Sequence, residues 1–441
     1  MMRNKIFLVI LFLSIVSQYV SHAEENDSLS LEQAVAIALH NNYNILIARN
    51  EAEISRNNAH PGNAGLLPAI SLSGGYNLAV EDTEIEFLGD IPPVDQRGVR
   101  TDTYNGSIGL NYLLFDGLGN FRNFQRLRLL GESGKVQSVM EIENTILQVV
   151  SQFLEAARLQ AVYRADQMAL DISSERYERV RTSYEFGGAN RLDVLNAEVD
   201  LSTDSVNTAV SRINYRTAIR NFNVLLGYPA NRNTDIRGQV SIAKNLDEEE
   251  LMDHTMRRNS ALRMADQNLM VTEADARIAQ AGRWPRIELN TSYGINRTEA
   301  EAGFLLFQQT IGFNGGINAS FNLFNGRQQA IQQQNAQVNL ENARKNRELV
   351  RLQTAAELSN AWDQYINGLQ LLDLEERNLE IARINFEVTE EQFRLGQVTG
   401  TQFREAQLNL IRAETRISET RFQAKQAETE LLRLAGLLET E

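Results

Sequence analysis

The sequence predicts an α+β membrane protein in which long coiled-coil helices are combined with a small set of strands, the whole arrangement being present twice. Three observations lead to this fold class. Helical patterns of unusual length are interrupted only by glycine turns, two pairs of segments alternate apolar with small polar residues, and both features recur about 209 residues further along the chain. We therefore expect an internal duplication of one unit.

The first 23 residues predict export. Arg3 and Lys5 precede an apolar run over 6–16, and residues 21–23 supply a small-x-small cleavage pattern. This run is shorter than the ~20 residues that a membrane-spanning helix needs. The formal charge of −14 argues against a nucleic-acid binder, and the lack of cysteine argues against a disulfide scaffold and a lipoprotein anchor. An acidic exported chain of this kind fits the periplasm or outer membrane of a Gram-negative cell.

The first structural repeat is predicted to span 24–227 and to begin with a helix. Apolar residues recur at helical spacing from Leu31 to about Leu66, and Ser30 is the expected N-cap. After Pro68 the period changes to two, which predicts a strand pair. The two strands are expected at 69–80 and 104–115, and the acidic stretch 81–103, with Pro92 and Pro93, is expected to be a loop.

A long helix is predicted over 118–185, where no proline occurs, and it would be on the order of 100 Å long. Gly187 and Gly188 then end it, because glycine adopts positive φ at no steric cost. A helix of half that length follows over 192–226. Its apolar residues fall on heptad a and d positions and predict a coiled-coil seam, which consists of Leu192, Leu195, Val199, Val206, Ala209 and Ile213.

A linker, with a short extended piece at 240–242, is predicted over 228–250, and the second repeat over 251–441. Phe324-Asn325-Gly326 matches Phe115-Asp116-Gly117, and Gly396 matches Gly187, at the same separation of 209 residues. After its first helix, the repeat is expected to contain strands at 286–296 and 309–324, a long helix at 327–395 and a short helix at 402–436.

The predicted strands indicate a shared transmembrane β-barrel. One face of each strand is apolar and aromatic, and the other carries asparagine, serine and glycine, as expected for a sheet with lipid on one side and water on the other. Four strands are too few to close a barrel, and an open edge in lipid leaves backbone groups unpaired. Three subunits with 4 strands each would give 12 in total. The mostly polar helices, with one narrow apolar seam, would form a hollow coiled-coil α-helical barrel.

These features resemble the TolC-like outer membrane efflux proteins. The most specific matches are the strand-to-helix corners LLFDGLGN (113–120) and NLFNGRQQ (322–329) and the helix tips YEFGGANRLDVLNAE (184–198) and FRLGQVTGTQFREAQ (393–407). The resemblance implies a homotrimeric exit duct in the cell outer membrane with a large periplasmic extension. It would serve a tripartite efflux or type I secretion system, receiving substrate from a periplasmic adaptor and an inner-membrane pump, without a cofactor.

The resemblance also implies roles for residues at the two tips. Asp193 matches an aspartate that latches the first tip in TolC, and Phe393 matches the tyrosine that partners it, but Val398 replaces the arginine of that latch. Glu405 keeps one of two pore-constricting acids and Gln402 replaces the other. Rings of Asp193 and Glu405 would favour cations at the entrance, although both also fit the alternative of ordinary solvated helix charges. The implied adaptor contacts are Phe186, Gly187, Gly188, Leu395 and Gly396.

Other classes of protein fit the sequence less well. An enzyme is not supported, because His40, His60 and His254 are isolated, and neither a catalytic motif nor a metal-ligand pattern occurs. A soluble β-sandwich would not leave such a uniform small polar face. The main alternative, a soluble periplasmic coiled-coil adaptor or scaffold protein, would explain the helices but not the four strands. A passive porin would need more strands and has no use for such long helices. The sequence favours no particular cargo, since drug, metal and protein export share this duct.

Overall fold

The structure is a computed structural model that describes residues 28–85, 88, 92, 94–238, 240–302 and 305–438. The predicted signal, 1–23, lies outside the described residues. Two compact units are present. The helical unit contains the described residues up to Ile47, Met140–Asn259 and the described residues from Ala355, and the strand unit contains Ala48–Val139 and Ser260–Thr354. None of the described helices combines the length and apolar character needed to cross a bilayer.

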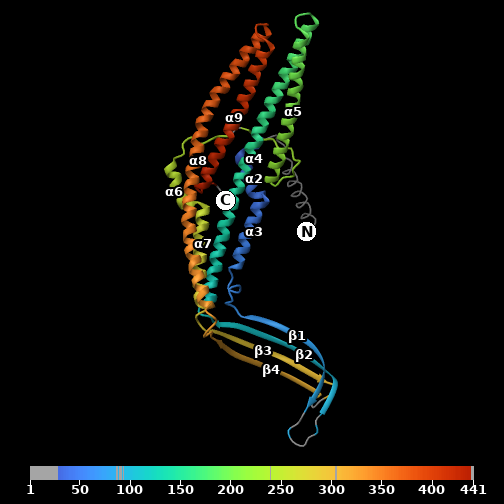
Figure 1. Cartoon of the computed structure of the whole chain (residues 1–441), viewed down its shortest axis with the longest axis vertical. Helices are drawn as coiled ribbons and strands as arrows, with labels where there is room; N and C mark the ends of the chain where they lie inside the picture. Colours follow the sequence, from blue (N-terminus) through green and yellow to red (C-terminus); the bar gives the residue numbers. More distant parts are fainter. Residues whose placement is uncertain are drawn as a thin grey trace, which may run out of the picture. The chain divides into compact units, whose positions relative to one another are not determined.

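The same order of elements occurs twice (Figure 1). The first copy comprises α2 (Leu31–Asn41), α3 (Tyr43–Asn58), β1 (Ala69–Ile85), β2 (Val94–Phe115), α4 (Gly119–Glu185) and α5 (Arg191–Leu225). The second comprises α6 (Glu248–Arg258), α7 (Ser260–Ala281), β3 (Arg286–Ala300), β4 (Phe307–Ser320), α8 (Gln328–Arg394) and α9 (Gly400–Leu434). The long and short helices of each copy therefore end within one to two residues of their predicted ends. In the linker, residues 240–242 pair with no described strand, whereas Ile236 bridges to Leu29.

The helix expected from Leu31 to Leu66 is divided at Asn42, and this part of the prediction was wrong. Ser30 is the N-cap of α2 as expected, but Asn42 has extended backbone with ψ 126°. Its side-chain oxygen accepts hydrogen bonds from the backbone N–H of Asn44 (2.8 Å) and of Ile45 (3.3 Å), which caps α3. Its amide nitrogen donates to the Leu225 carbonyl at 2.7 Å. One buried side chain thus starts a helix and terminates another.

The second copy repeats this joint at Asn259. Asn259 separates α6 from α7, is almost fully buried, and donates its side-chain amide to the Leu434 carbonyl at 2.9 Å. Leu434 is equivalent to Leu225 in the duplication. Periodicity does not reveal these joints, because an asparagine between two helical patterns does not disturb the apolar spacing on either side.

Asn42→Leu is expected to lower the free energy of unfolding by about 2–4 kcal/mol, because the cap of α3 is lost and the partly buried Leu225 carbonyl loses its donor. Thermal unfolding followed by circular dichroism at 222 nm measures this. Asn58→Leu, at the exposed end of α3, is the matched control and should change little. Equal shifts for the two variants would contradict the role of the joint.

β1, β2 and β3 are longer than the sequence predicted, and the loop expected at 81–103 is mostly strand. β1 continues to Ile85 and β2 begins at Val94, with Glu81 opposite Val99 and a bulge after Glu81. Most of these added residues are polar, so they lack the alternation on which the prediction depended. In the second copy β3 continues to Ala300, and β4 ends at Ser320 rather than at 324.

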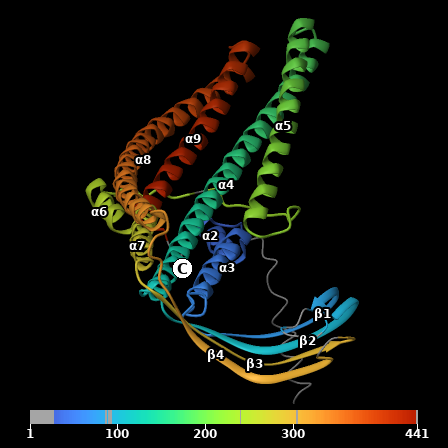
Figure 2. The same cartoon turned by 60° about the horizontal axis from the view of Figure 1, so that its bottom comes forward.

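The sheet has one apolar and one small polar face across all its strands, which are antiparallel in the order β1-β2-β3-β4. The strands lie side by side and curve together (Figure 2). The cross-strand pairs form rows, and one row is wholly apolar while the adjacent row is small and polar. The apolar row is Leu72, Ile108, Tyr293 and Phe313, all exposed, and the polar row is Ser71, Gly109, Ser292 and Asn314.

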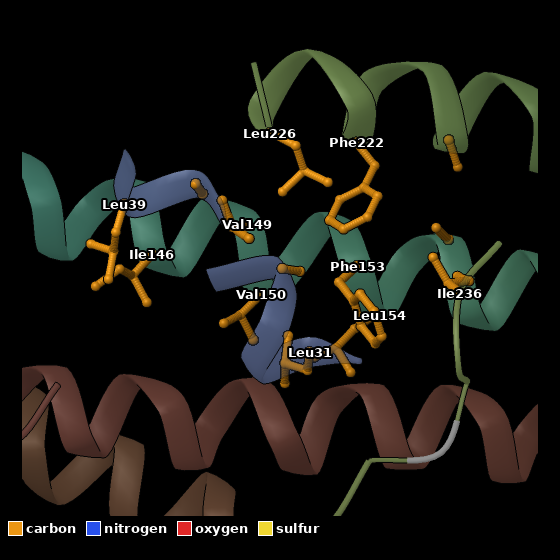
Figure 3. Close-up of a cluster of buried hydrophobic side chains, with 14 of the residues drawn as sticks. Leu31, Leu39, Ile146, Val149, Val150, Phe153, Leu154, Phe222, Leu226 and Ile236 are labelled. Carbon is orange, nitrogen blue, oxygen red and sulfur yellow. The ribbon is translucent and has the colours of Figure 1, made fainter. Parts of the chain in front are cut away.

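The largest apolar core lies in the helical unit and joins α2, α4, α5 and the segment around Ile236 (Figure 3). Phe153 is fully buried and meets Phe222 edge-on, with ring centroids 5.7 Å apart at 69°. The predicted α4 seam forms part of this core and consists of Ile142, Ile146, Val149 and Phe153. A second cluster around Leu358, Tyr365 and Leu431 forms the corresponding core of the second copy.

Candidate functional site at the helix tips

Both helical hairpins turn through a glycine in the left-handed region. Gly187 has φ 80° and Gly396 has φ 72°. The turns are closed in the same way, by Gly188 N–H to Ser183 carbonyl (2.7 Å) and by Gln397 N–H to Gln392 carbonyl (2.9 Å). No atom lies within 4 Å of where a Cβ on Gly187 or Gly396 would be. Backbone conformation, rather than space, therefore requires glycine at both turns.

The tips present bare apolar side chains. Phe186 is 86% exposed and Leu395 is 63% exposed, each directly before its turn glycine. Gly188 is a different case from its neighbour, because a Cβ there would lie 2.8 Å from the Ser183 hydroxyl oxygen. Large apolar residues exposed at the end of a rigid hairpin are typical of a surface that another protein covers.

Asp193 and Gln402 occupy the same structural position in the two copies. Asp193 accepts a hydrogen bond from the Asn190 N–H (3.1 Å) while its own N–H donates to the Asn190 side chain (3.0 Å). Gln402 and Thr399 form the corresponding reciprocal pair at 2.9 and 3.3 Å. These are capping boxes at the starts of α5 and α9. Both residues therefore have a local role in beginning a helix.

Phe393 belongs to an aromatic cluster inside the second hairpin. Its ring stacks on Phe403 with centroids 4.8 Å apart, and Phe403 also contacts Phe386 at 5.7 Å. A phenylalanine lacks the hydroxyl with which a tyrosine would bind Asp193. Val398 is half-buried at the turn before α9 and has no charge to contribute. The arrangement at these two positions excludes a latch made of Asp193, a tyrosine and an arginine.

Glu405 is exposed on the second turn of α9. Within the described part of one protomer it makes no side-chain hydrogen bond or ion pair. In the same described ranges no group of three or more His, Cys, Asp or Glu could hold a metal ion. Of the predicted gate residues, Glu405 is thus the one whose charge is committed to no local interaction.

Sequence reasoning missed a buried group of polar and charged residues between the two hairpins, which we call the acid–arginine cluster. It consists of Ser173, Arg176, Asp200, Asp204, Arg404 and Gln407. Arg404 binds Asp204 through two nitrogens, at 2.6 and 2.8 Å, and reaches Asp200 at 3.7 Å. The Ser173 hydroxyl also donates to Asp204, and Arg176 pairs with Asp200.

Comparing the two copies would have revealed this cluster. The buried face of α5 has small residues seven apart, and Asp204 interrupts that row. The row is Ala197, Asp204, Ser211 and Ala218, and its counterpart in α9 is Ala406, Ala413, Thr420 and Ala427. Asp204 thus lies where the other copy has an alanine, on a helix face that otherwise carries small residues. A carboxylate at such a position indicates that it has a specific partner.

The chain is similar to known proteins in both sequence and structure. The model of the family described as outer membrane efflux protein matches residues 34–228 and 251–437. Nodulation protein T of Rhizobium leguminosarum bv. trifolii is 20% identical over 423 residues, covering 94% of this chain and 85% of that protein.

Two solved structures illustrate the shared fold. The CmeC outer membrane channel of Campylobacter jejuni superposes with a TM-score of 0.76 at 14% identity, covering 92% of this chain and 85% of that one. The outer membrane protein VceC of Vibrio cholerae gives 0.70 at 14% identity, covering 92% and 96%.

Proposed function

Because the chain belongs to the outer membrane efflux protein family, we propose that three copies form one exit duct, which receives substrate from a periplasmic adaptor and an inner-membrane pump. Members of this family are transport proteins of the outer membrane. Because this chain is a member, it has the function of an exit duct. The number of copies, the partners and the residues of the entrance are the proposed part.

One observation carries the proposal, namely that the sheet is incomplete by itself. Its apolar row is exposed, and β1 and β4 each have an edge without a neighbouring strand in the chain as described. In lipid, an apolar face is stable but an unpaired strand edge is not, because its N–H and C=O groups have no partners. Pairing β4 of one copy with β1 of the next removes both edges, and three copies supply 12 strands, enough to close a barrel.

The oligomeric state tests this directly. Protein extracted from outer membranes in mild detergent is expected to have the mass of three chains by light scattering after size exclusion, and deletion of the gene is expected to abolish export by the associated pump. A monomer that fractionates with soluble periplasmic protein would overturn the proposal and favour the alternative, a soluble coiled-coil adaptor or scaffold.

The tips are the proposed adaptor contact. Phe186 and Leu395 are the exposed apolar side chains there, and the turns of Gly187, Gly188 and Gly396 hold them at the ends of the hairpins. Photo-crosslinking from positions 186 and 395 in cells is expected to trap the adaptor. Crosslinks from positions on the β1–β2 hairpin only, with none from either tip, would refute this assignment.

Glu405 is the proposed selectivity residue of the entrance. Three copies of this unpaired carboxylate near the tunnel end would attract cations. Glu405→Ala is expected to lower the cation-to-anion permeability ratio about twofold or more in planar bilayers. Asp193→Asn also removes a carboxylate at a tip but keeps a capping acceptor, so it separates charge from helix capping. An unchanged permeability ratio in Glu405→Ala would exclude the role.

A further inference from the structure

The acid–arginine cluster joins three helices that belong to different hairpins. Arg404 and Gln407 lie in the first two turns of α9, while Asp200 and Asp204 lie on α5 and Ser173 and Arg176 lie on α4. The cluster also makes hydrogen bonds to the backbone: Gln407 donates to the Ala169 carbonyl at 3.1 Å, and Arg176 donates to the Gly400 carbonyl at 3.4 Å. The second hairpin is therefore attached to the first by hydrogen bonds and charges near the start of α9.

The cluster is electrically balanced and partly to fully buried, since the side chains of Arg404 and Asp200 are 13% and 27% exposed. Asp204 and Arg176 are 3% and 5% exposed, and two guanidinium groups face two carboxylates. Burial alone would lower the pKa of Arg404, but its hydrogen bonds to Asp204 and the charges of Asp204 and Asp200 outweigh that effect and raise it. Arg404 is thus charged under all physiological conditions. A buried, paired charge of this kind is costly to leave without its partner.

The contacts within the second hairpin are of a different kind. Phe393 stacks on Phe403 and Phe386 meets Phe403 at a tilt, so these rings hold α8 to α9. Ile172 of α4 also packs on this cluster from the first hairpin. Separating apolar surfaces exposes them to water at a cost proportional to their area. Separating a charged contact lets both ions regain hydration, so the parted state is accessible. The hairpin α8–α9 is accordingly held together internally and joined to α4–α5 by a reversible contact.

We propose that Arg404, bound to Asp204 and Asp200, is the latch that holds the second hairpin against the first, in place of a latch at the tip turns. This rests on the proposed duct function, for which the hairpin ends form the tunnel entrance. Position 398, where the tip latch would need an arginine, is a valine. The carboxylate of Asp193 is engaged in the capping box of α5. The ionic links between the hairpins lie further from the tips instead. Arg404 with Asp204 and Asp200 is the one near the start of α9, and Arg158 with Glu419, 3.4 Å apart, lies further along the helices.

The test uses hydrogen–deuterium exchange of the full-length protein in detergent. Arg404→Ala is expected to make amides over 187–204 and 396–410 exchange about tenfold faster or more, with the core around Phe153 unchanged. Arg416→Ala is the matched control, since Arg416 pairs with Glu375 at 3.3 Å and links α9 to α8 within one hairpin. Arg404→Lys, which keeps the charge, is expected to restore much of the protection.

Each outcome of the exchange experiment either supports or overturns the latch. Equal exchange in Arg404→Ala and Arg416→Ala, or acceleration spread evenly over the core, would overturn the latch. If Arg404→Ala does not accumulate, Arg176→Met replaces it. This variant loses the bond to the Gly400 carbonyl and the pairing with Asp200 but keeps the bidentate pair of Arg404 with Asp204. It should speed up amide exchange in the same two segments, and unchanged exchange there would overturn the latch. Bilayer conductance then tests the duct separately: a lack of conductance in wild type and variants refutes the duct, whereas exchange still decides the latch.

Discussion

Glutamate at both Val199 and Val206 is expected to convert the protein entirely to monomers in detergent. These residues belong to the seam of α5, and both are exposed in the single chain. The face of α5 that packs inside the chain is the opposite one, with Ala197, Asp204 and Phe222. A heptad stripe that none of the described elements of its own chain covers is suited to a neighbouring copy.

α8 offers a surface that would cover this seam. Four of its apolar residues are exposed at heptad-like spacing in the helical unit, namely Leu374, Ile381, Ile384 and Val388. Packing the α5 seam of one copy against this stripe of the next would remove both from water. Two glutamates in every α5 would then bury unpaired carboxylates at each of three contacts, at a cost of several kcal/mol per charge.

Light scattering after size exclusion measures the result. The matched control is Asn196→Glu with Asn207→Glu, which adds the same charge to exposed positions of α5 off the seam. This control should remain trimeric. If the variant with both Val199→Glu and Val206→Glu forms as much trimer as wild type, the seam faces water and a different surface joins the subunits.

What could be predicted from sequence depended on whether a residue's role shows in local spacing. The turn glycines and Ser30 act on their immediate neighbours, so their roles were evident from the sequence. The apolar face of the sheet was evident because every second residue contributes to it. The strand ends at Ile85 and Val94 were not, since the mostly polar sequence next to these ends gives no apolar alternation.

The candidate site was harder to predict because its interactions are between segments distant in sequence. Arg404 and Asp204 are 200 residues apart, and a charge at helical spacing ordinarily indicates a solvated face. Asp193 is the opposite case, because its contacts are local. The family resemblance suggested a latch, whereas an acid three residues after Asn190 already satisfies a capping box by local geometry alone.

Phe153→Ala is expected to lower the free energy of unfolding by about 3–5 kcal/mol, the second large effect. The ring is fully buried between α2, α4 and α5, so its removal leaves a cavity that rigid helices cannot fill. It also removes an edge-to-face contact with Phe222, worth about 0.5–1.5 kcal/mol. Urea unfolding followed by circular dichroism gives the change.

The duplication supplies the control for this experiment. Trp362 is the counterpart of Phe153 in α8, but it is only half-buried and lies at the margin of the second core, with its ring 5.6 Å from that of Tyr365. Because part of its surface is already in water, Trp362→Ala is expected to cost about half as much as Phe153→Ala. Equal losses would mean that the two cores are covered alike in the assembled protein, which would require a neighbouring subunit to bury Trp362.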